Sequence, residues 1–194
     1  MKLKIIPFTQ AELLTSFQQT NREVADFFAA IPAERFFAHP DGVWSPAENL
    51  VHLLKAVSPV ARAMKLPKFV LALLFGRGKQ SSRTLEQIRT TYLEKLAQGA
   101  RASGGFVPQI DGNPSDPRQV QQGLIQKWNE VSARVPAVLA TWNDSLLDQR
   151  SLPHPILGKL TVREMLFFTL YHNTHHVSDV ERLLAGNKFP EKID

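Results

Sequence analysis

The sequence predicts an all-α protein: a bundle of four long helices with one or two additional short helices. Three observations predict this class. Apolar residues recur at helical spacing over long segments, the segments begin at residues that cap helices, and proline or glycine separates them. The 194 residues suffice for a sizeable core, so residues 1–194 are expected to form a single domain. A short strand near the N-terminus is the only strand that the pattern suggests.

The first long helix is expected from Thr9 to Ile31. Thr9 and Glu12 have the spacing of a capping box, in which each side chain accepts the backbone N–H of the other residue. The helix then carries an apolar stripe that consists of Leu13, Phe17, Val24, Phe27, Phe28 and Ile31. Pro32 ends the helix, because proline cannot continue helical hydrogen bonding.

The second long helix is expected to run to about Leu66. Ser45 is a suitable N-cap, Pro46 occupies the first helical position, and Glu48 completes a second capping box. Pro59 lies inside this helix and is expected to kink it.

The middle of the chain alternates between helices and breakers. A short apolar helix is expected over residues 68–75, another helix over 83–100, and the third long helix over 117–142, with a bend at Pro136. Residues 104–117 form a long loop, and such loops are often functional or mobile. The loop and the apolar 69–75 segment could wall a pocket, or the same apolar segment could form a dimer surface.

The last long helix is expected from Thr161 to about Leu184. Thr161 and Glu164 repeat the capping-box spacing, and Gly186 provides a stop. The segment before this helix is interpreted as a connector because it contains Pro153, Pro155 and Gly158.

The composition limits the chemistry that the chain can perform. It contains no cysteine, which excludes disulfides, thiolate nucleophiles, iron–sulfur clusters and cysteine zinc sites. Any metal ion must therefore be held by imidazole nitrogens and carboxylate oxygens.

Charge and hydropathy bear on the partners and the location of the protein. The formal net charge is +5 at pH 7, but the basic residues are mostly scattered and no aromatic residues are interleaved with them, so nucleic acid is not expected as the main partner. The longest apolar run, residues 69–75, is far shorter than the ~20 residues of a membrane-spanning helix. The first residues lack the long apolar core of a signal peptide. A cytoplasmic protein without a membrane partner is expected.

Two histidines of the last helix have the spacing of a metal-binding pair. His172 and His176 are four residues apart, which places both imidazoles on one face of the helix at about 6 Å. A helical projection places the pair on the flank of the apolar stripe, with Asp179 beside it as a candidate acceptor that orients an imidazole, and with His175 facing outward. Pairs of this spacing also arise by chance, so the pair alone leaves a surface role open.

The remaining histidines are less informative by position. His52 lies in the second helix on the same flank as Glu48, but it projects away from the apolar stripe, so periodicity alone does not select it as a ligand. Glu48 is better explained as a helix cap than as a ligand. His39 and His154 each precede a proline in a loop and have no obvious partner.

Two segments resemble the signatures of the DinB-like superfamily. Residues 44–53, Trp-Ser-Pro-Ala-Glu-Asn-Leu-Val-His-Leu, resemble its W-S-x-x-E…H-L entry to the second helix. Residues 158–176 end in His-Asn-Thr-His-His and resemble its H-x-x-H-H segment on the last helix. The order and separation of the two segments also fit, so the resemblance covers nearly the whole chain.

The resemblance implies an up-and-down four-helix bundle with unusual connectivity, often dimeric, so a homodimer is expected. It also implies a divalent metal ion, with zinc or nickel favoured, and water in the open coordination positions. Carried over by motif, the ligands are His52, His172 and His176. One departure is Asp179, because many relatives have Gln there; this departure places a carboxylate near the ion.

A three-histidine site of this kind predicts a metal-dependent enzyme that acts on a small molecule. Three protein ligands leave an open position, which is the catalytic pattern, and Asp179 or Glu48 could serve as the base or proton acceptor. Characterised members of the superfamily include enzymes that use low-molecular-weight thiols, so the resemblance implies a thiol S-transferase acting on small electrophiles.

Two alternatives remain open: a metal-dependent hydrolase, and a non-catalytic metal-binding stress protein. A solvent-accessible pocket at the ion would favour catalysis, and a sealed ion would favour a structural role.

Overall fold

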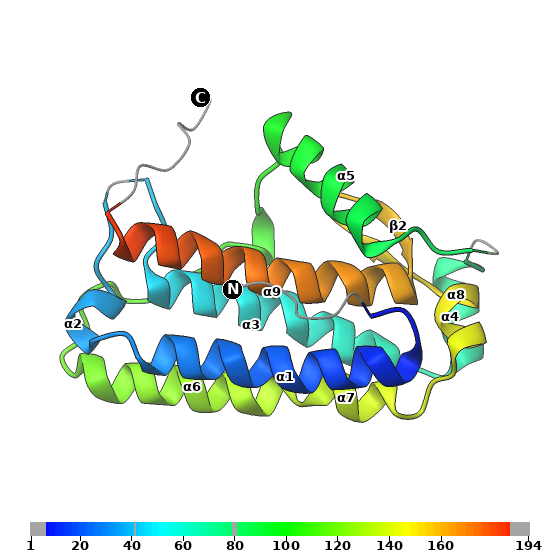
Figure 1. Cartoon of the computed structure of the whole chain (residues 1–194), viewed down its shortest axis with the longest axis horizontal. Helices are drawn as coiled ribbons and strands as arrows, with labels where there is room; N and C mark the ends of the chain where they lie inside the picture. The colour runs from blue at the N-terminus through cyan, green and yellow to red at the C-terminus, as the bar shows by residue number, and fades with distance from the viewer. Residues whose placement is uncertain (1–6, 41, 79–80, 187–194) are drawn as a thin grey trace.

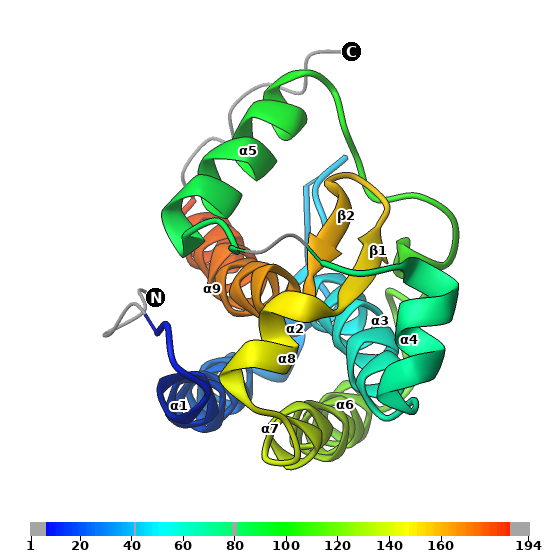
Figure 2. The same ribbon diagram turned by 90° about the vertical axis from the view of Figure 1, so that its right-hand side faces the viewer.

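Four long helices lie side by side along the longest axis of the protein (Figures 1 and 2). The structure is a computed structural model, and it describes residues 7–40, 42–78 and 81–186. The bundle is built from α1 (Gln10–Ala29), α3 (Pro46–Met64), α6 (Pro117–Ser132) continued by α7 (Arg134–Leu139), and α9 (Val162–Leu184). The four-helix bundle expected from the sequence is confirmed.

The bundle has an unusual order of helices. Both α1 and α3 pack against α6 and α9, so that α1 and α3 lie on opposite corners of the bundle. The colours in Figure 1 show that α1 and α9 run in one direction, whereas α3 and α6 run in the other. Because α3 and α9 are antiparallel neighbours, residues near the start of α3 lie beside residues in the second half of α9.

The starts of the long helices are fixed by local hydrogen bonds. The capping boxes expected at three of them are formed, by the residue pairs Thr9 and Glu12, Ser45 and Glu48, and Thr161 and Glu164. Each box satisfies backbone N–H groups that have no partner within the helix.

The last helix, α9, is covered from several sides. It packs against α1 and α3 within the bundle, and against α5 (Leu85–Ala97) and a β-hairpin outside it (Figure 2). Consequently its polar flank is buried along with its apolar stripe. His172 and His176 lie on that buried flank.

The third long helix is interrupted rather than bent. It stops at Ser132 and resumes at Arg134 as α7. Pro136 has no N–H with which to reach the carbonyl of Ser132, and that carbonyl instead accepts a hydrogen bond of 3.0 Å from the amide of Asn21 on α1. By contrast, α3 continues as a helix through Pro59.

The connector expected before α9 is a β-hairpin, so that interpretation was wrong. Strand β1 (Ser151–His154) pairs antiparallel with β2 (Gly158–Thr161). Pro153 is tolerated because a two-stranded sheet has an edge on each strand, where a missing N–H costs little. The paired residues Leu152 and Leu160 are buried and anchor the hairpin on the bundle. The short N-terminal strand suggested by the sequence lies outside the described residues.

The remaining helices surround the bundle. Two were expected, α4 (Lys68–Phe75) and α5, whereas α2 (Ala33–Phe36), α8 (Asp144–Gln149) and the 3₁₀ turn η1 (Gly104–Phe106) were not. The α4 helix exposes Phe69, Leu73 and Leu74 and turns Leu71 inward. Within the described ranges, no helix is both long enough and apolar enough to cross a membrane.

Candidate metal centre

Three histidines from two helices converge inside the bundle. His52 comes from α3, and His172 and His176 come from α9. The Nε2 atom of His172 lies 3.1 Å from Nε2 of His52 and 3.1 Å from Nε2 of His176. One nitrogen of each ring lies within 4.8 Å of the other two, so the group could hold a metal ion. The three residues are only 5%, 4% and 7% exposed, respectively.

The outer nitrogens of two of these rings are held by hydrogen-bond acceptors. Nδ1 of His52 donates to the backbone carbonyl of Phe106 at 2.8 Å, and Nδ1 of His176 donates to the side-chain oxygen of Asn49 at 2.7 Å. A carbonyl oxygen can only accept, so the proton of each neutral ring is on Nδ1. The Nε2 lone pairs of both rings therefore point to the centre of the cluster.

The amide of Asn49 can adopt only one orientation. Its nitrogen donates to the backbone carbonyls of Trp44 at 3.1 Å and Ser45 at 3.0 Å. A flipped amide would place its oxygen against both carbonyls and its nitrogen against the Nδ1–H of His176. The first turn of α3 thus fixes Asn49, and Asn49 fixes the tautomer of His176.

This donor set fits a cation. If Nε2 of His172 carries its proton, this single N–H must be shared between the Nε2 lone pairs of His52 and His176. A divalent ion would instead bind the Nε2 atoms of all three rings. Burial lowers the pKa of all three histidines, and the neighbouring imidazoles lower those of His172 and His176 further. The rings are therefore neutral at neutral pH, which is the form that binds metals.

An indole ring covers one side of the cluster. Trp44 lies 4.9 Å from His52 and 6.1 Å from His176, measured between ring centroids, and is nearly parallel to the His176 ring. Its large apolar surface shields this side from water and restricts the motion of both imidazoles. The Trp-Ser pair that begins α3 therefore has two roles, as a cover for the cluster and as the helix cap.

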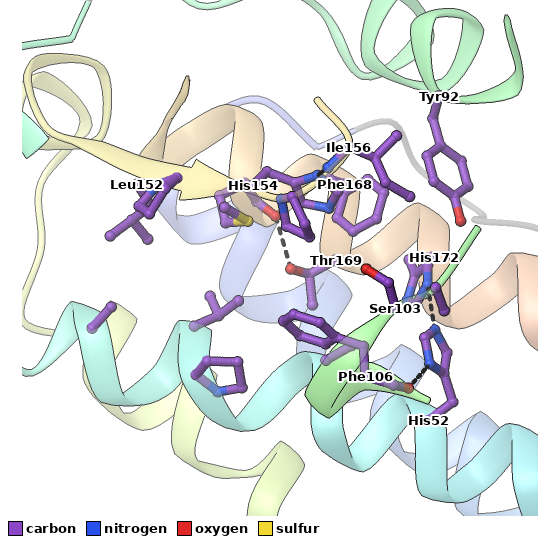
Figure 3. A pocket seen from close by; sticks show the side chains of 18 of the residues that line it. His52, Tyr92, Ser103, Phe106, Leu152, His154, Ile156, Phe168, Thr169 and His172 are labelled. Carbon is purple, nitrogen blue, oxygen red and sulfur yellow. Dashed lines mark hydrogen bonds between the residues drawn. The ribbon is translucent and has the colours of Figure 1, made fainter. Parts of the chain in front are cut away.

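The other side of the cluster opens into a cavity of about 300 Å³ (Figure 3). His52 and His172 belong to its wall. The other walls come from α3, α4, α5, α9, the hairpin and the segment before and within η1, and they include Phe75, Tyr92, Arg101, Phe106, His154 and Phe168. Both segments that the sequence suggested as pocket walls thus contribute residues. No carboxylate lines the cavity in the described part of the chain.

The two candidate catalytic carboxylates lie away from this cavity wall. Asp179 was expected to orient an imidazole, but the hydrogen bond from His176 goes to Asn49, and the Asp179 carboxylate lies 3.8 Å from Nδ1 of His176. Asp179 pairs with Arg182 and lies 3.5 Å from Nε2 of His175. Glu48 accepts the N–H of Ser45 at 2.7 Å as part of the capping box.

Several residues of the site were not identified from the sequence. Asn49 could have been found as a polar residue beside Leu50 on the buried side of α3, one turn before His52. No local pattern could have identified Tyr92, Phe168 or His154, because each reaches the cavity only through the packing of α5, α9 and the hairpin.

Fold and site together define a helical-bundle protein with a buried three-histidine cluster beside a cavity. The sequence model of the DinB superfamily matches residues 16–180, and the chain belongs to this superfamily. The family suggested by the two sequence signatures is therefore confirmed.

One solved structure shares the fold over almost the whole length. This is YfiT from Bacillus subtilis, described as "a probable metal-dependent hydrolase with an unusual four-helix bundle topology". The TM-score is 0.59 and the identity 16%, with 97% of this chain and 94% of that chain covered. A comparison with curated protein sequences gave no match.

Proposed function

We propose that this protein is a metal-dependent enzyme in which His52, His172 and His176 hold one divalent ion. The observation that carries the proposal is that His52 and His172 belong both to the histidine cluster and to the wall of the cavity. An ion held there would be sealed by protein on the Trp44 side and open to a substrate on the other side. This arrangement supports catalysis over the non-catalytic stress protein, for which a closed site is typical.

The donor set supports zinc or nickel. Imidazole nitrogen suits both ions, and neither a thiolate nor a carboxylate lies in the cluster. Such an ion would lower the pKa of a bound water or thiol and would polarise a substrate carbonyl. The chain supplies the neutral ligands, their fixed tautomers and the exclusion of bulk water.

Hydrolysis of a small, largely apolar substrate is the reaction that we favour. The cavity is at the lower end of the size range of ligand pockets, roughly 300–1,000 Å³, which suits one small molecule better than two. The description of YfiT as a probable metal-dependent hydrolase points the same way. We assign Asp179 to the pairing with His175 and Arg182, and Glu48 to the capping of α3.

Transfer of a low-molecular-weight thiol to a small electrophile is the second candidate. The observation that favours it is the exposed Arg101 on the cavity wall, whose guanidinium could bind the carboxylate of such a thiol. Because the chain has no cysteine, the thiol would have to be a co-substrate.

The test begins with elemental analysis of the purified protein, followed by loading with zinc or nickel. The loaded protein is assayed against a panel of small aryl esters and amides, and separately for thiol consumption with small electrophiles. The proposal expects about one ion per chain and activity that a chelator abolishes and the metal restores. Protein that binds no divalent ion, even when it is supplied, would overturn it.

A further inference from the structure

The turn of the β-hairpin holds His154 in one protonation state. The side chain folds back over the turn, so that its Nδ1 atom accepts hydrogen bonds from the backbone N–H groups of Ile156 at 3.1 Å and Leu157 at 3.0 Å. Backbone N–H groups can only donate, so Nδ1 carries no proton.

The second ring nitrogen must therefore carry the proton. A neutral imidazole has one N–H, and with Nδ1 bare it lies on Nε2. Burial of His154 lowers its pKa to about 4, so the ring is neutral across the physiological range. The hairpin thus presents a fixed Nε2–H donor.

This donor has no partner in the described part of the chain, although the ring lines the cavity. Its ring contacts Phe168 at 4.2 Å between centroids, and Phe168 lies 5.0 Å from His172 on its other side. Figure 3 shows His154 beside Phe168 on the hairpin side of the cavity, with His172 and His52 on the far side. One phenyl ring therefore separates the donor from the histidine cluster.

Two further polar groups of the cavity wall, on Tyr92 and Arg101, can also donate hydrogen bonds. Burial raises the pKa of Tyr92, so its hydroxyl stays protonated, and Arg101 is cationic. Since no carboxylate lines the wall in the described residues, no negative charge on the wall balances an ammonium group.

We propose that His154 is a substrate-binding residue, whose Nε2–H donates to a carbonyl or carboxylate oxygen at the hairpin end of the cavity while the reacting bond lies at the histidine cluster. This inference rests on the proposed function and adds a substrate class: a small molecule with an apolar body, a second oxygen acceptor remote from the reacting bond, and no ammonium group there. A role as general base is excluded for His154, because its basic nitrogen is committed to the turn.

The tautomer can be measured without any substrate. Long-range ¹H–¹⁵N correlation spectra of ¹⁵N-labelled full-length protein at pH 7, with and without zinc, distinguish the two neutral tautomers and the imidazolium ion. We expect the Nε2–H tautomer for His154 in both samples. An Nδ1–H tautomer or a charged ring would overturn the proposal.

Binding is then measured with two probes of matched shape, acetophenone and ethylbenzene, of which only the first carries an acceptor oxygen. Acetophenone is expected to shift the Nε2–H resonance of His154 and to bind more tightly than ethylbenzene. His154→Phe should weaken acetophenone binding about 3- to 10-fold, the value of one hydrogen bond, and leave ethylbenzene binding unchanged.

His154→Gln is the matched control. Its amide N–H₂ reaches the position of Nε2 but does not replace the acceptor that Nδ1 gives to the turn. Acetophenone binding should be retained in His154→Gln while both variants lose similar stability. Equal loss of binding in the two variants, or none in either, would overturn the proposal. Because these measurements need no zinc and no turnover, they stand even if the metal-dependent activity is not found.

Discussion

The two halves of α9 each bury a polar cluster, and the clusters differ in how completely the protein satisfies them. The ion-pair cluster consists of Arg163 and Glu164, which lie in the first turn of α9, and of their charged partners from other segments. The histidine cluster consists of His52, His172 and His176, two to three turns later. All five of these residues are less than about a tenth exposed.

The guanidinium of Arg163 uses every N–H that it has. It donates to both carboxylate oxygens of Asp148, at 2.7 and 3.0 Å, to the side chain of Asp144 at 3.1 Å, to the backbone carbonyl of Asp144 at 2.9 Å, and to the carbonyl of Phe8. A cluster closed in this way has no donor left for a ligand, and its role is structural.

Both carboxylate oxygens of Glu164 likewise have hydrogen-bond donors within the protein. One oxygen accepts the backbone N–H and the Nε–H of Arg83, each at 2.9 Å, and the other accepts the N–H of Thr161 at 3.0 Å. Burial alone would raise the pKa of Glu164, but the hydrogen bonds from Arg83 and Thr161 lower it overall. The carboxylate therefore stays ionised although it is buried.

The histidine cluster, by contrast, leaves its inner nitrogens facing one another. The outer nitrogens of His52 and His176 are satisfied by Phe106 and Asn49, so the nitrogens that these two rings leave without a matching donor lie at the centre. Burial of polar groups therefore does not by itself indicate a site. The indication is a set of lone pairs that the fold directs to one point without supplying a matching donor.

The largest effect is expected for His172→Ala, because this variant removes the nitrogen shared by both short contacts of the cluster. Zinc content measured by elemental analysis should fall from about one ion per chain to background, with the helical circular dichroism spectrum unchanged. His39→Ala, at an exposed loop, is the control. Full zinc occupancy in His172→Ala would contradict the assignment of the histidine cluster as the metal-binding site.

Arg163→Ala should have the opposite profile. It removes the Arg163 donors from two carboxylates and two carbonyls, so the free energy of unfolding should fall by about 2–4 kcal/mol in urea titrations. Zinc binding per folded molecule should stay intact. As a control, Arg89→Ala breaks an exposed pair with Glu86 and should cost less than about 1 kcal/mol. A loss of zinc in Arg163→Ala would show that the two clusters are coupled.

A smaller effect is expected at Asn49, which orients His176 without binding the ion itself. Asn49→Ala should weaken zinc affinity about 10- to 100-fold in competition with a chelator of known affinity. Asn49→Asp keeps the acceptor for His176 but sets its second oxygen against the carbonyls of Trp44 and Ser45, so it should lower stability while retaining more zinc affinity than Asn49→Ala. Asn21→Ala, which removes another buried amide, on α1 at the opposite corner of the bundle, should lower stability alone. Equal affinities in Asn49→Ala and the wild type would contradict the role assigned to Asn49.

The two clusters should also respond to acid in separate pH ranges. Folding lowers the pKa of each cluster histidine below the value of 6.5 for a free ring, so their contribution is present above pH 6.5 and is lost as the pH falls below it. The pKa of Glu164 is lowered from 4.5, so the ion-pair cluster loses its contribution only below that pH. Thermal melts of metal-free protein at pH 8, 6 and 5 should show a gradual decline that is shallower in His172→Phe. A melting temperature independent of pH over this range would count against neutral buried imidazoles.

Features that depend on only a few consecutive residues could be predicted from the sequence alone. The capping pairs Thr9 and Glu12, and Thr161 and Glu164, form as expected, because each joins atoms within one helical turn. The pair His172 and His176 shares one face for the same reason. The sequence also predicted a bend at Pro136. It did not predict that the helix is interrupted before the proline, or that the amide of Asn21 donates to the carbonyl left free there.

The way in which distant segments meet could not be predicted in this way, because it depends on the packing of the whole chain. His52 is 120 residues from His172, and the resemblance to the superfamily, not periodicity, identified it as a candidate ligand. The hairpin was missed because its prolines indicate a loop locally, whereas the burial of Leu152 and Leu160 against the bundle stabilises the strands. The cavity depends on the same packing: α5 and the hairpin must lie over α9 before Tyr92 and His154 can face the histidines. Helical hydrogen bonds and caps are local, but a convergent site depends on the relative placement of whole helices, which only the packed core determines.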